Sequence, residues 1–408
     1  MAETKHNERD AAISIIKTLR SANHTAYLAG GCVRDQLLGE NPKDYDVATS
    51  AHPEHIAELF SKTAAVGAAF GVMLVRDFGP TVEVATFRSD GPYSDARRPD
   101  HVHFSSPEKD AQRRDFTINA LFLDPSDEGD TIIDFVDGQA DIEARILRAV
   151  GDPDARLKED HLRALRAVRF AARYNLTIDP KTSQAIKVHA SELAGVSIER
   201  IGEEVRRMMC HESRPRAAGL LQQLTLDQDI FGTKPKSLEL SVLSGLDPAA
   251  DAMTALAAWA VDRLDDTSTL NWRTKLDLSN EQSQQLHATL DISNVLLADW
   301  GTLSIAARKR LACRPHCCGA IMLARAINPV ATQALCNDIQ AMTNDGIGLN
   351  PEPLITGQTL IEMGQSPGQA FKEVLHRVYD AQLEGKVDSF ESARNLAQEL
   401  FVKRSQSD

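Results

Sequence analysis

Closely spaced carboxylates near the start of the chain have the pattern of a metal site. Asp44 and Asp46 stand two positions apart in a strand-like segment, where alternate side chains point to one face. Two adjacent carboxylates repel each other unless they share a cation, and hard oxygen ligands suit Mg²⁺ bound together with substrate phosphates. Glu83, between two valines in a second strand-like run, is a third candidate ligand. The Asp-x-Asp pair by itself is also typical of a solvated turn.

A pair of glycines precedes these carboxylates. Gly30 and Gly31 follow a strand-like run and open a short helix, so their backbone N–H groups are able to approach a chain of phosphates. Arg34 lies one turn into that helix and adds a charge-assisted donor. A lone glycine pair is usually only a turn. Followed ten residues after Arg34 by Asp44, the pair predicts a phosphate site beside a metal site.

Charged residues also recur at every third position of a later, helix-like segment: Asp160, Arg163, Arg166 and Arg169. Side chains three positions apart are neighbours on a helix, so these form a slowly turning stripe. A carboxylate next to a guanidinium presents an acceptor and donors that match the edge of a nucleobase. The same stripe is typical of a solvated helix on which Asp160 pairs with Arg163.

The elements that position these residues read as an α/β unit followed by helices. β-Branched or apolar runs flanked by Gly and Pro predict strands, at residues 24–29, 45–48, 72–75 and 82–87. A polar segment with Gly and Pro predicts a long functional loop at residues 90–109. From residue 141 onward the spacing predicts helices, at 142–150, 160–174, 180–193, 199–211 and 216–224, with an irregular stretch at 227–246.

Composition narrows the class of protein. The 408 residues are 42% apolar and 25% charged, which is ordinary for a folded globular chain. A net charge of −13 argues against non-specific coating of nucleic acid, although it leaves room for a local basic groove. No apolar run approaches the roughly 20 residues of a membrane span, and residues 1–20 lack the pattern of a secretory signal. Six cysteines in a chain of this length favour a reducing, cytoplasmic setting.

In this order the motifs resemble the class II branch of the polymerase-β-like nucleotidyltransferases, which comprises bacterial CCA-adding enzymes and bacterial poly(A) polymerases. Residues 30–35 (Gly-Gly-Cys-Val-Arg-Asp) and the Asp-Tyr-Asp at 44–46 are similar to that family's phosphate and metal motifs. Residues 82–88 resemble the strand with the third carboxylate. Residues 113–120 resemble the ribose-sensing motif, and residues 159–166 resemble the nucleobase-reading motif. The resemblance spans residues 25–175.

The resemblance implies roles for individual residues. The catalytic residues and Mg²⁺ ligands would be Asp44, Asp46 and Glu83. Nucleotide contacts would come from Gly30, Gly31, Arg34, Arg114, Asp115, Asp160, Arg163, Arg166 and Arg169. Among these, Asp160 and Arg163 would read the base of CTP or ATP in place of a template strand. Arg114 would bind phosphate, and Asp115 would lie near the ribose.

The resemblance also implies an α/β polymerase-β-like head followed by an elongated all-α neck, body and tail. The expected bounds are 1–140 for the head, 141–215 for the neck, 216–330 for the body and 331–408 for the tail. The body and tail would grip the acceptor arm of tRNA through phosphate contacts, with Arg308, Lys309 and Arg310 as candidate donors. We expect no membrane contact and no obligate protein partner.

Several relatives share this head, and the sequence favours addition of C, C and A over the others. Residues 67–72 and 357–368 look like those of CCA-adding enzymes, and the loop at 90–109, with Asp95 and Arg97 as a hypothetical switch from C to A, is intact. A poly(A) polymerase, a CC-only or A-only enzyme, and a degenerate RNA-binding protein remain alternatives. The cluster of Cys313, Cys317 and Cys318 lacks a second ligand pair at the spacing of a zinc site, so we expect packing instead.

Overall fold

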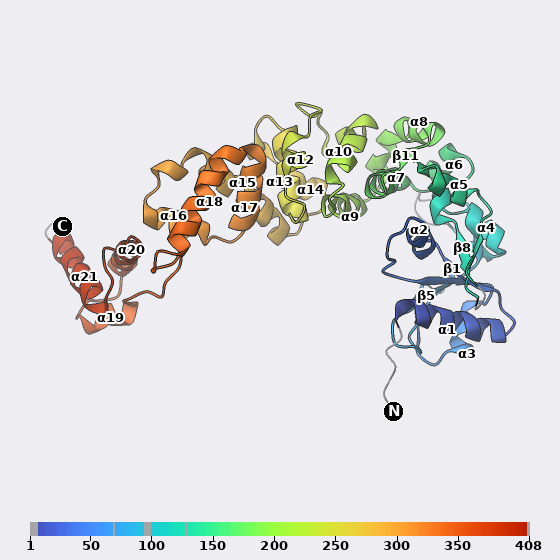
Figure 1. Ribbon diagram of the computed structural model, residues 1–408, viewed down its shortest axis with the longest axis horizontal. Helices are drawn as coiled ribbons and strands as arrows, with labels where there is room; N and C mark the ends of the chain where they lie inside the picture. The colour runs from blue at the N-terminus through green and yellow to red at the C-terminus, as the bar shows by residue number, and fades with distance from the viewer. Residues whose placement is uncertain (1–6, 68–69, 94–98, 127–128, 406–408) are drawn as a thin grey trace. The chain divides into compact units, whose positions relative to one another are not determined.

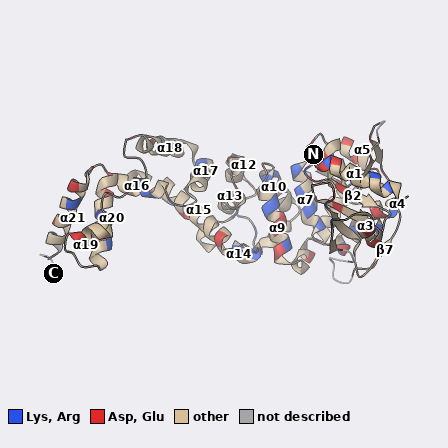
Figure 2. Cartoon of the chain, turned by 90° about the horizontal axis from the view of Figure 1, so that it is seen from below, with Lys and Arg blue, Asp and Glu red and all other residues tan. Residues whose placement is uncertain are grey.

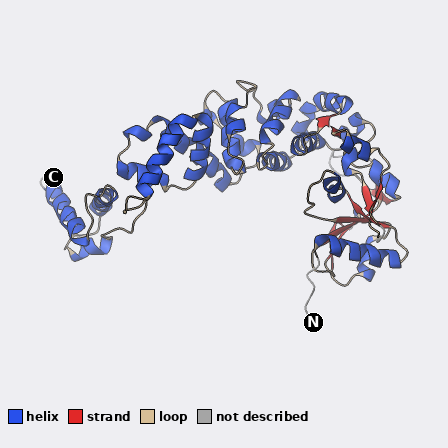
Figure 3. Cartoon of the chain, in the orientation of Figure 1, coloured by secondary structure: helices blue, strands red, loops and turns tan. Residues whose placement is uncertain are grey.

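The computed structural model describes residues 7–67, 70–93, 99–126 and 129–405. The chain divides into two compact units, which are described separately (Figure 1). The first comprises Met1–Lys234 and Thr274–Asp277, and the second comprises Pro235–Arg273 and Leu278–Asp408. All strands of the described residues lie in the first unit (Figure 3).

A seven-stranded mixed sheet forms the N-terminal part of the first unit, with the order β3-β4-β5-β2-β1-β8-β9. Strands β2 and β5 are parallel, and the other neighbours in this sheet are antiparallel. The strands are β1 (Ala26–Ala29), β2 (Asp46–Thr49), β3 (Thr63–Gly67), β4 (Val72–Val75), β5 (Val82–Thr86), β8 (Phe122–Asp124) and β9 (Thr131–Ile133). The four predicted strand runs therefore all contain strands.

Alternation along the strands gives the sheet one covered face and one face that lines a cavity. In β5, Val82, Val84 and Thr86 are buried, whereas Glu83 is exposed. Helix α1 (Glu8–Ser21) contacts β1, β2 and β5, and it packs against α3 (Pro53–Leu59). Residues such as Ile15 and Leu19 of α1 are completely buried in this layer. The other side of β2 and β5 is left for the site.

Helices complete the first unit and lie mainly after the sheet. They are α2 (Gly31–Leu37), α4 (Pro107–Gln112), α5 (Gly138–Glu143), α6 (Pro153–Glu159), α7 (Arg163–Arg173), α8 (Pro180–Val188), α9 (Ile198–Met209), α10 (Arg214–Gln223) and α11 (Leu226–Phe231). Helix α14 (Trp272–Lys275) lies at the boundary between the two units.

The helix predicted at 142–150 is wrong. Helix α5 ends at Glu143, and Arg145 then has a φ of 56°, in the left-handed region that interrupts a helix. The next residues form β10 (Ile146–Leu147), which pairs in parallel with β11 (Thr177–Ile178). This pairing with a segment 31 residues further along uses the backbone groups that a helix would need.

The helix predicted at 160–174 begins three residues later than expected. Asp160 has an extended backbone with a φ of −154°, and its Oδ1 accepts a hydrogen bond from the Leu162 N–H at 3.1 Å. This contact starts a turn that leads into α7 at Arg163. Asp160 therefore precedes the helix that carries the three arginines.

The predicted long loop at 90–109 is shorter in the structure. Strand β6 (Arg88–Asp90) pairs with β7 (Val102–Phe104), and α4 follows at Pro107. These elements hold both ends of the segment close together. Asp95 and Arg97, and part of the segment 67–72, lie outside the described residues.

The second unit is helical and holds two separate apolar cores. One forms around Ile292, Leu296 and Trp300, and the other around Leu360, Phe371 and Val378. Its helices are α12 (Ser241–Gly245), α13 (Ala252–Arg263), α15 (Asn280–Ala298), α16 (Ile305–Ala312), α17 (Cys317–Ile327), α18 (Pro329–Thr343), α19 (Gly357–Glu362), α20 (Gln369–Leu383) and α21 (Phe390–Ser405). In the described ranges, no helix combines the length and apolar character needed to cross a membrane.

The basic run 308–310 does not form a free cationic surface. Lys309 is completely buried, and its Nζ donates to Asp345 Oδ2 at 2.6 Å. Arg308 contacts the Trp300 carbonyl, and Arg310 pairs with Asp380 at 2.7 Å. The prediction of these residues as phosphate donors is wrong for Lys309, because its side chain is inside the unit.

Candidate active site

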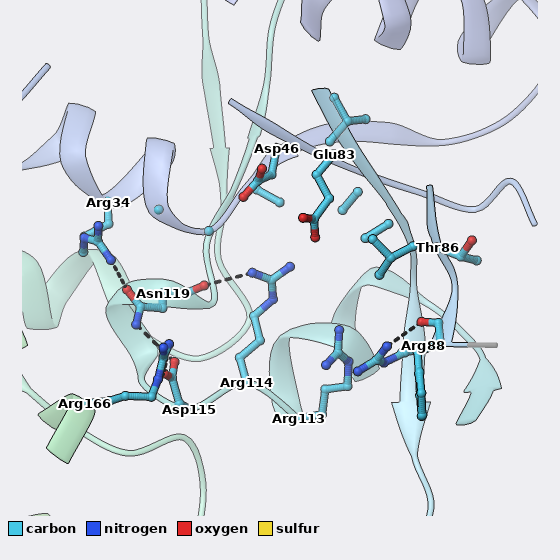
Figure 4. Close-up of a pocket in the computed structure, with 18 of the residues that line it drawn as sticks. Arg34, Asp46, Glu83, Thr86, Arg88, Arg113, Arg114, Asp115, Asn119 and Arg166 are labelled. Carbon is cyan, nitrogen blue, oxygen red and sulfur yellow. Dashed lines mark hydrogen bonds and ion pairs between the residues drawn. The ribbon is translucent and has the colours of Figure 1, made fainter. Parts of the chain in front are cut away.

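A cavity of about 580 Å³ lies within the first unit, between the sheet and the helices that follow it (Figure 4). Its walls come from β2, β5, the start of α2, the segment 113–119 and α7. The predicted site residues that line it are Gly30, Gly31, Arg34, Asp46, Glu83, Arg114, Asp115, Asp160, Arg163 and Arg166. The two predicted groups, the acidic strands and the base-reading segment, therefore share one cavity.

Asp46 and Glu83 are neighbours on two parallel strands. Each directly precedes a residue of the registered pair Val47–Val84, and both carboxylates point into the cavity (Figure 4). Burial, followed by the negative charges of Glu83 and Asp44, raises the pKa of Asp46 to about 6, and Arg114 opposes this shift. Asp44 itself is exposed and is not among the lining residues.

The close approach of Arg114 to the glycine turn shapes one side of the cavity. Gly30 has a φ of 72°, and a Cβ there would lie 2.9 Å from Arg114 Nη1. The same Nη1 donates to the Asn119 carbonyl at 3.1 Å. Glycine is favoured at position 30 because other residues rarely adopt this backbone angle, and a Cβ there would also displace the Arg114 guanidinium.

A buried carboxylate that the sequence did not reveal holds the arginines in place. Asp110, only 2% exposed, accepts from Arg113 through one oxygen and from Arg114 through the other, at 2.9 and 3.0 Å. Its burial opposes ionisation, but the two guanidinium groups lower its pKa. Asp110 thus fixes the direction of two cations that line the cavity.

Asp115 forms a second ion pair on the wall of the cavity. Its Oδ2 accepts two hydrogen bonds from Arg166 at 2.8 and 2.6 Å, and its Oδ1 accepts from the Asn119 side chain at 3.1 Å. Burial works against the charged carboxylate, but Arg166 and Asn119 lower the pKa of Asp115 to about 2. This ion pair, in which two nitrogens of Arg166 donate to one oxygen of Asp115, joins the segment after α4 to α7.

Arg34 lines the cavity but also has protein partners on all three of its nitrogens. Its Nη1 donates to Asn119 at 2.6 Å, its Nη2 donates to Tyr174 at 2.7 Å, and its Nε donates to Asp35 at 2.8 Å. The guanidinium also lies 4.5 Å from the centre of the Tyr174 ring. These contacts give Arg34 a positioning role between α2 and the end of α7.

Asp160 and Arg163, the expected base readers, are held by separate partners instead of by each other. Asp160 Oδ2 accepts from Arg200 of α9 at 2.7 Å. Arg163 donates to the Arg156 carbonyl at 2.8 Å and to Glu159 at 2.5 Å. Arg200 is therefore a further residue of the site that the sequence did not reveal, since it lies 40 residues after Asp160.

Arg169 differs from the other predicted residues in its surroundings. It does not line the cavity, and its Nε donates to the buried Glu204 of α9 at 2.6 Å.

In the ranges that the structure describes, no three His, Cys, Asp or Glu side chains are arranged to hold a metal ion. Neither the carboxylates of β2 and β5 nor the cysteines at 313, 317 and 318 form such a group of three in the described residues.

Comparison with known proteins gives the family. Residues 26–148 match the family described as the Poly A polymerase head domain, and residues 175–233 match the probable RNA and SrmB-binding site of polymerase A. The CCA-adding enzyme of Lactobacillus helveticus is 32% identical over 392 residues, which cover 93% of this chain and 95% of that protein. The chain belongs to the family of CCA-adding enzymes. The enzyme of Lactiplantibacillus plantarum is 37% identical over 300 residues, covering 70% and 72% of the two chains.

Solved structures of CCA-adding enzymes agree with this assignment. The Bacillus stearothermophilus CCA-adding enzyme in complex with CTP superposes with a TM-score of 0.81 at 28% identity, over 97% of this chain and 98% of that chain. The Thermotoga maritima enzyme complexed with tRNA has the same fold, with a TM-score of 0.70 at 19% identity, over 98% of this chain and 97% of that one. The predicted family and the predicted fold class, an α/β head followed by helices, are confirmed.

Proposed function

We propose that this chain adds C, C and A to the 3′ end of tRNA from CTP and ATP and releases pyrophosphate, without a nucleic-acid template. The observation that supports the proposal is the shared cavity, which is lined both by the carboxylates of Asp46 and Glu83 and by the proposed base-reading pair Asp160 and Arg163. Membership of the CCA-adding family supports it. We place this reaction in the cytoplasm, where tRNA and nucleoside triphosphates occur.

The carboxylates suit Mg²⁺. Asp46 and Glu83 present hard oxygen donors side by side, and their mutual repulsion, with that of Asp44, is of the kind that a divalent cation relieves. In this proposal Asp46 and Glu83 hold the metal and Asp44 assists them. When bound, Mg²⁺ supplies charge neutralisation at the reacting phosphate and the attacking 3′-hydroxyl.

The protein's own contribution at the phosphates is orientation. In this proposal Arg114 donates to the triphosphate, while Asp110 and the Asn119 carbonyl keep its guanidinium in place. The backbone of Gly30 and Gly31 adds N–H groups where α2 begins. Arg34 and the Asp115–Arg166 pair keep the two walls of the cavity together and, through Asp115, lie near the ribose.

Base selection falls to Asp160 and Arg163 in this proposal. A carboxylate accepts from the exocyclic amino group that cytosine and adenine share, and a guanidinium donates to a ring nitrogen or carbonyl. UTP has a carbonyl in place of that amino group, so its base would present an acceptor, instead of a donor, to the Asp160 carboxylate. A site that leaves a polar group unpaired discriminates strongly.

We further propose that tRNA is bound by phosphate contacts along the helices after residue 140. Arginine residues recur along α7, α9 and α10 of the first unit (Figure 2), and on α9 they are interspersed with glutamates. The division into neck (141–215), body (216–330) and tail (331–408) is kept as part of this proposal. Because the whole chain has a net charge of −13, phosphate binding would depend on local clusters of positive charge such as the arginines of α7.

One assay tests the activity. The purified protein is incubated with Mg²⁺, labelled CTP and ATP, and tRNA that lacks its last three nucleotides. Addition that stops after three nucleotides is expected. A long ladder with ATP alone would mean a poly(A) polymerase, a stop after two nucleotides would mean a CC-only enzyme, and no labelling would overturn the proposal.

A further inference from the structure

Two histidines and one glutamate form a cluster next to the turn that carries Asp160. Nδ1 of His161 lies 3.1 Å from Glu192 Oε2, and Nδ1 of His189 lies 3.0 Å from the same oxygen. The other ring nitrogen of His189 lies 2.9 Å from Asp154 Oδ1. His189 is buried and His161 is mostly buried, so the cluster lies largely inside the unit.

The cluster joins three elements to the base-reading turn. His161 is in the turn 160–162, Asp154 belongs to α6, and Glu192 belongs to η3 (Ala190–Gly195), which follows α8. Arg200 of α9 holds the Asp160 carboxylate. Two adjacent residues therefore fix the turn. Asp160 is held by α9, and His161 contacts η3.

The two rings contact Glu192 through their Nδ1 atoms, and His189 also makes a hydrogen bond with Asp154 through its Nε2. In the described part of the chain, neither Nδ1 has a hydrogen-bond partner with standard geometry, although both lie within ion-pair distance of Glu192. The charged groups that face the rings are Glu192 from η3 and Asp154 from α6. Burial opposes a charge on His189, but Glu192 and Asp154 raise its pKa.

We propose that His161 and His189, bridged by Glu192, are positioning residues for Asp160 and make base selection depend on pH. This inference rests on the proposed role of Asp160 in base reading. When His189 is protonated, its imidazolium holds the Glu192 carboxylate in the position that contacts His161, and the turn is held firmly. When His189 loses its proton, this attraction weakens, and the Asp160 carboxylate keeps only its contacts with Arg200 and with the Leu162 N–H.

The direction of the pH effect follows from the raised pKa of His189. A histidine whose pKa is raised in the folded protein contributes stabilisation that is fully present below about pH 6.5 and is lost as the pH rises through the folded value. Selection of CTP over UTP is therefore expected to be strongest at mildly acidic pH and to weaken as the pH rises toward 8.

The test compares kcat/KM for CTP with kcat/KM for UTP at pH values from 5.5 to 8.5, on the full chain. The ratio cancels the pH dependence of the chemical step that both nucleotides share. We expect the wild-type ratio to fall about 10-fold across this range, the size of loss that a small displacement of a positioning group produces. In H161Q and E192Q the ratio is expected to be low and independent of pH. H55Q, which changes an exposed histidine of α3, should keep the wild-type profile.

A second measurement follows the cluster directly. Proton NMR of the imidazole C2–H resonances gives the pKa of His189, which is expected to fall in E192Q and to stay unchanged in H55Q. A wild-type ratio that does not change with pH, or an H161Q ratio that follows the wild-type profile, would overturn the inference. If D160A keeps full CTP selectivity, the proposed role of Asp160 fails, whereas the NMR result for the bridge still stands on its own.

Discussion

The backbone of Gly30 lies so close to the guanidinium of Arg114 that a Cβ at position 30 would be 2.9 Å from Nη1. The glycine turn and the segment after α4 therefore meet at the cavity, on the side where we propose that phosphates bind. The positive φ favours glycine at position 30, and a Cβ there would displace the Arg114 guanidinium.

Replacing Gly30 with alanine should therefore disable the enzyme through Arg114. We expect kcat/KM for CTP to fall about 100-fold, comparable to the loss of one preorganised donor. Gly39→Ala is the matched control, because Gly39 also has a positive φ of 79° but no atom within 4 Å of its would-be Cβ. Steady-state kinetics of both variants separate backbone strain from displacement of Arg114. Equal losses in the two variants would contradict the role given to Arg114.

Asp46 provides a prediction in which stability and activity change in opposite directions. Burial, together with the negative charges of Glu83 and Asp44, raises its pKa to about 6, so its charge at neutral pH costs folding free energy when no metal is present. Asp46→Asn should raise the melting temperature of the metal-free protein and reduce nucleotide addition by about 100-fold or more. Thermal unfolding in a chelator and the tRNA assay measure the two effects.

The raised pKa of Asp46 also makes the stability of the metal-free protein depend on pH. A carboxyl whose folded pKa lies above its unfolded value binds more protons in the native state, so stability falls as the pH rises from about 4 to about 6. Asp46→Asn should remove this decline, and excess Mg²⁺ should reduce it. If D46N in the presence of a chelator melts at or below the wild-type temperature at pH 7, the charge of Asp46 does not destabilise the metal-free fold.

The pKa of Asp115 is lowered instead of raised, so the stability of the protein is expected to depend on pH in the opposite direction. Its pKa of about 2, set by Arg166 and Asn119 against the cost of burial, means that its ion pair stabilises the fold above pH 4. This stabilisation is lost as the pH falls from about 4 to about 2. Asp115→Asn should lower stability at pH 7 and flatten the acid branch of the unfolding curve. Denaturant titrations at pH 3 and pH 7 give the free energy of unfolding of each protein. If the difference in this free energy between the two pH values is the same in the variant as in the wild type, the pair is not a stabilising contact.

The contrast between predicted and observed features follows from sequence distance. Gly30, Asp46, Glu83 and Asp160 were recognisable because short motifs carry their chemistry locally. Asp110 was missed although Arg113 and Arg114 follow it by only three and four positions, because the local sequence does not show that its carboxylate is buried. The helix predicted at 142–150 failed because of a distant contact, since a parallel pairing with Thr177 and Ile178 outweighs the local helical spacing.

Arg34 and Lys309 show the same limit for cations. From the sequence, both residues were candidate phosphate ligands. In the structure both side chains are buried and donate to residues of other elements. A sequence pattern identifies a charged residue, whereas its partners depend on tertiary packing between segments as far apart as Arg34 and Tyr174, which are 140 positions apart. The roles of such residues therefore had to come from the structure.

Arg200 lies outside the recognised motifs but contacts the residue that we propose reads the base. It belongs to α9 and donates to Asp160 Oδ2 at 2.7 Å, so it sets the direction of that carboxylate. Arg200→Gln should lower the preference for CTP over UTP about 10-fold, with a smaller effect on the maximal rate of C addition, because a misplaced Asp160 acts on the base and not on the phosphates. Arg200→Lys should restore part of the preference. Arg207→Gln, which changes an exposed arginine of the same helix that pairs with Glu203, should leave it unchanged. If R200Q lowers the rates for CTP and UTP equally, Arg200 stabilises the helices without directing Asp160, and base selection must depend on Arg163 and its own partners.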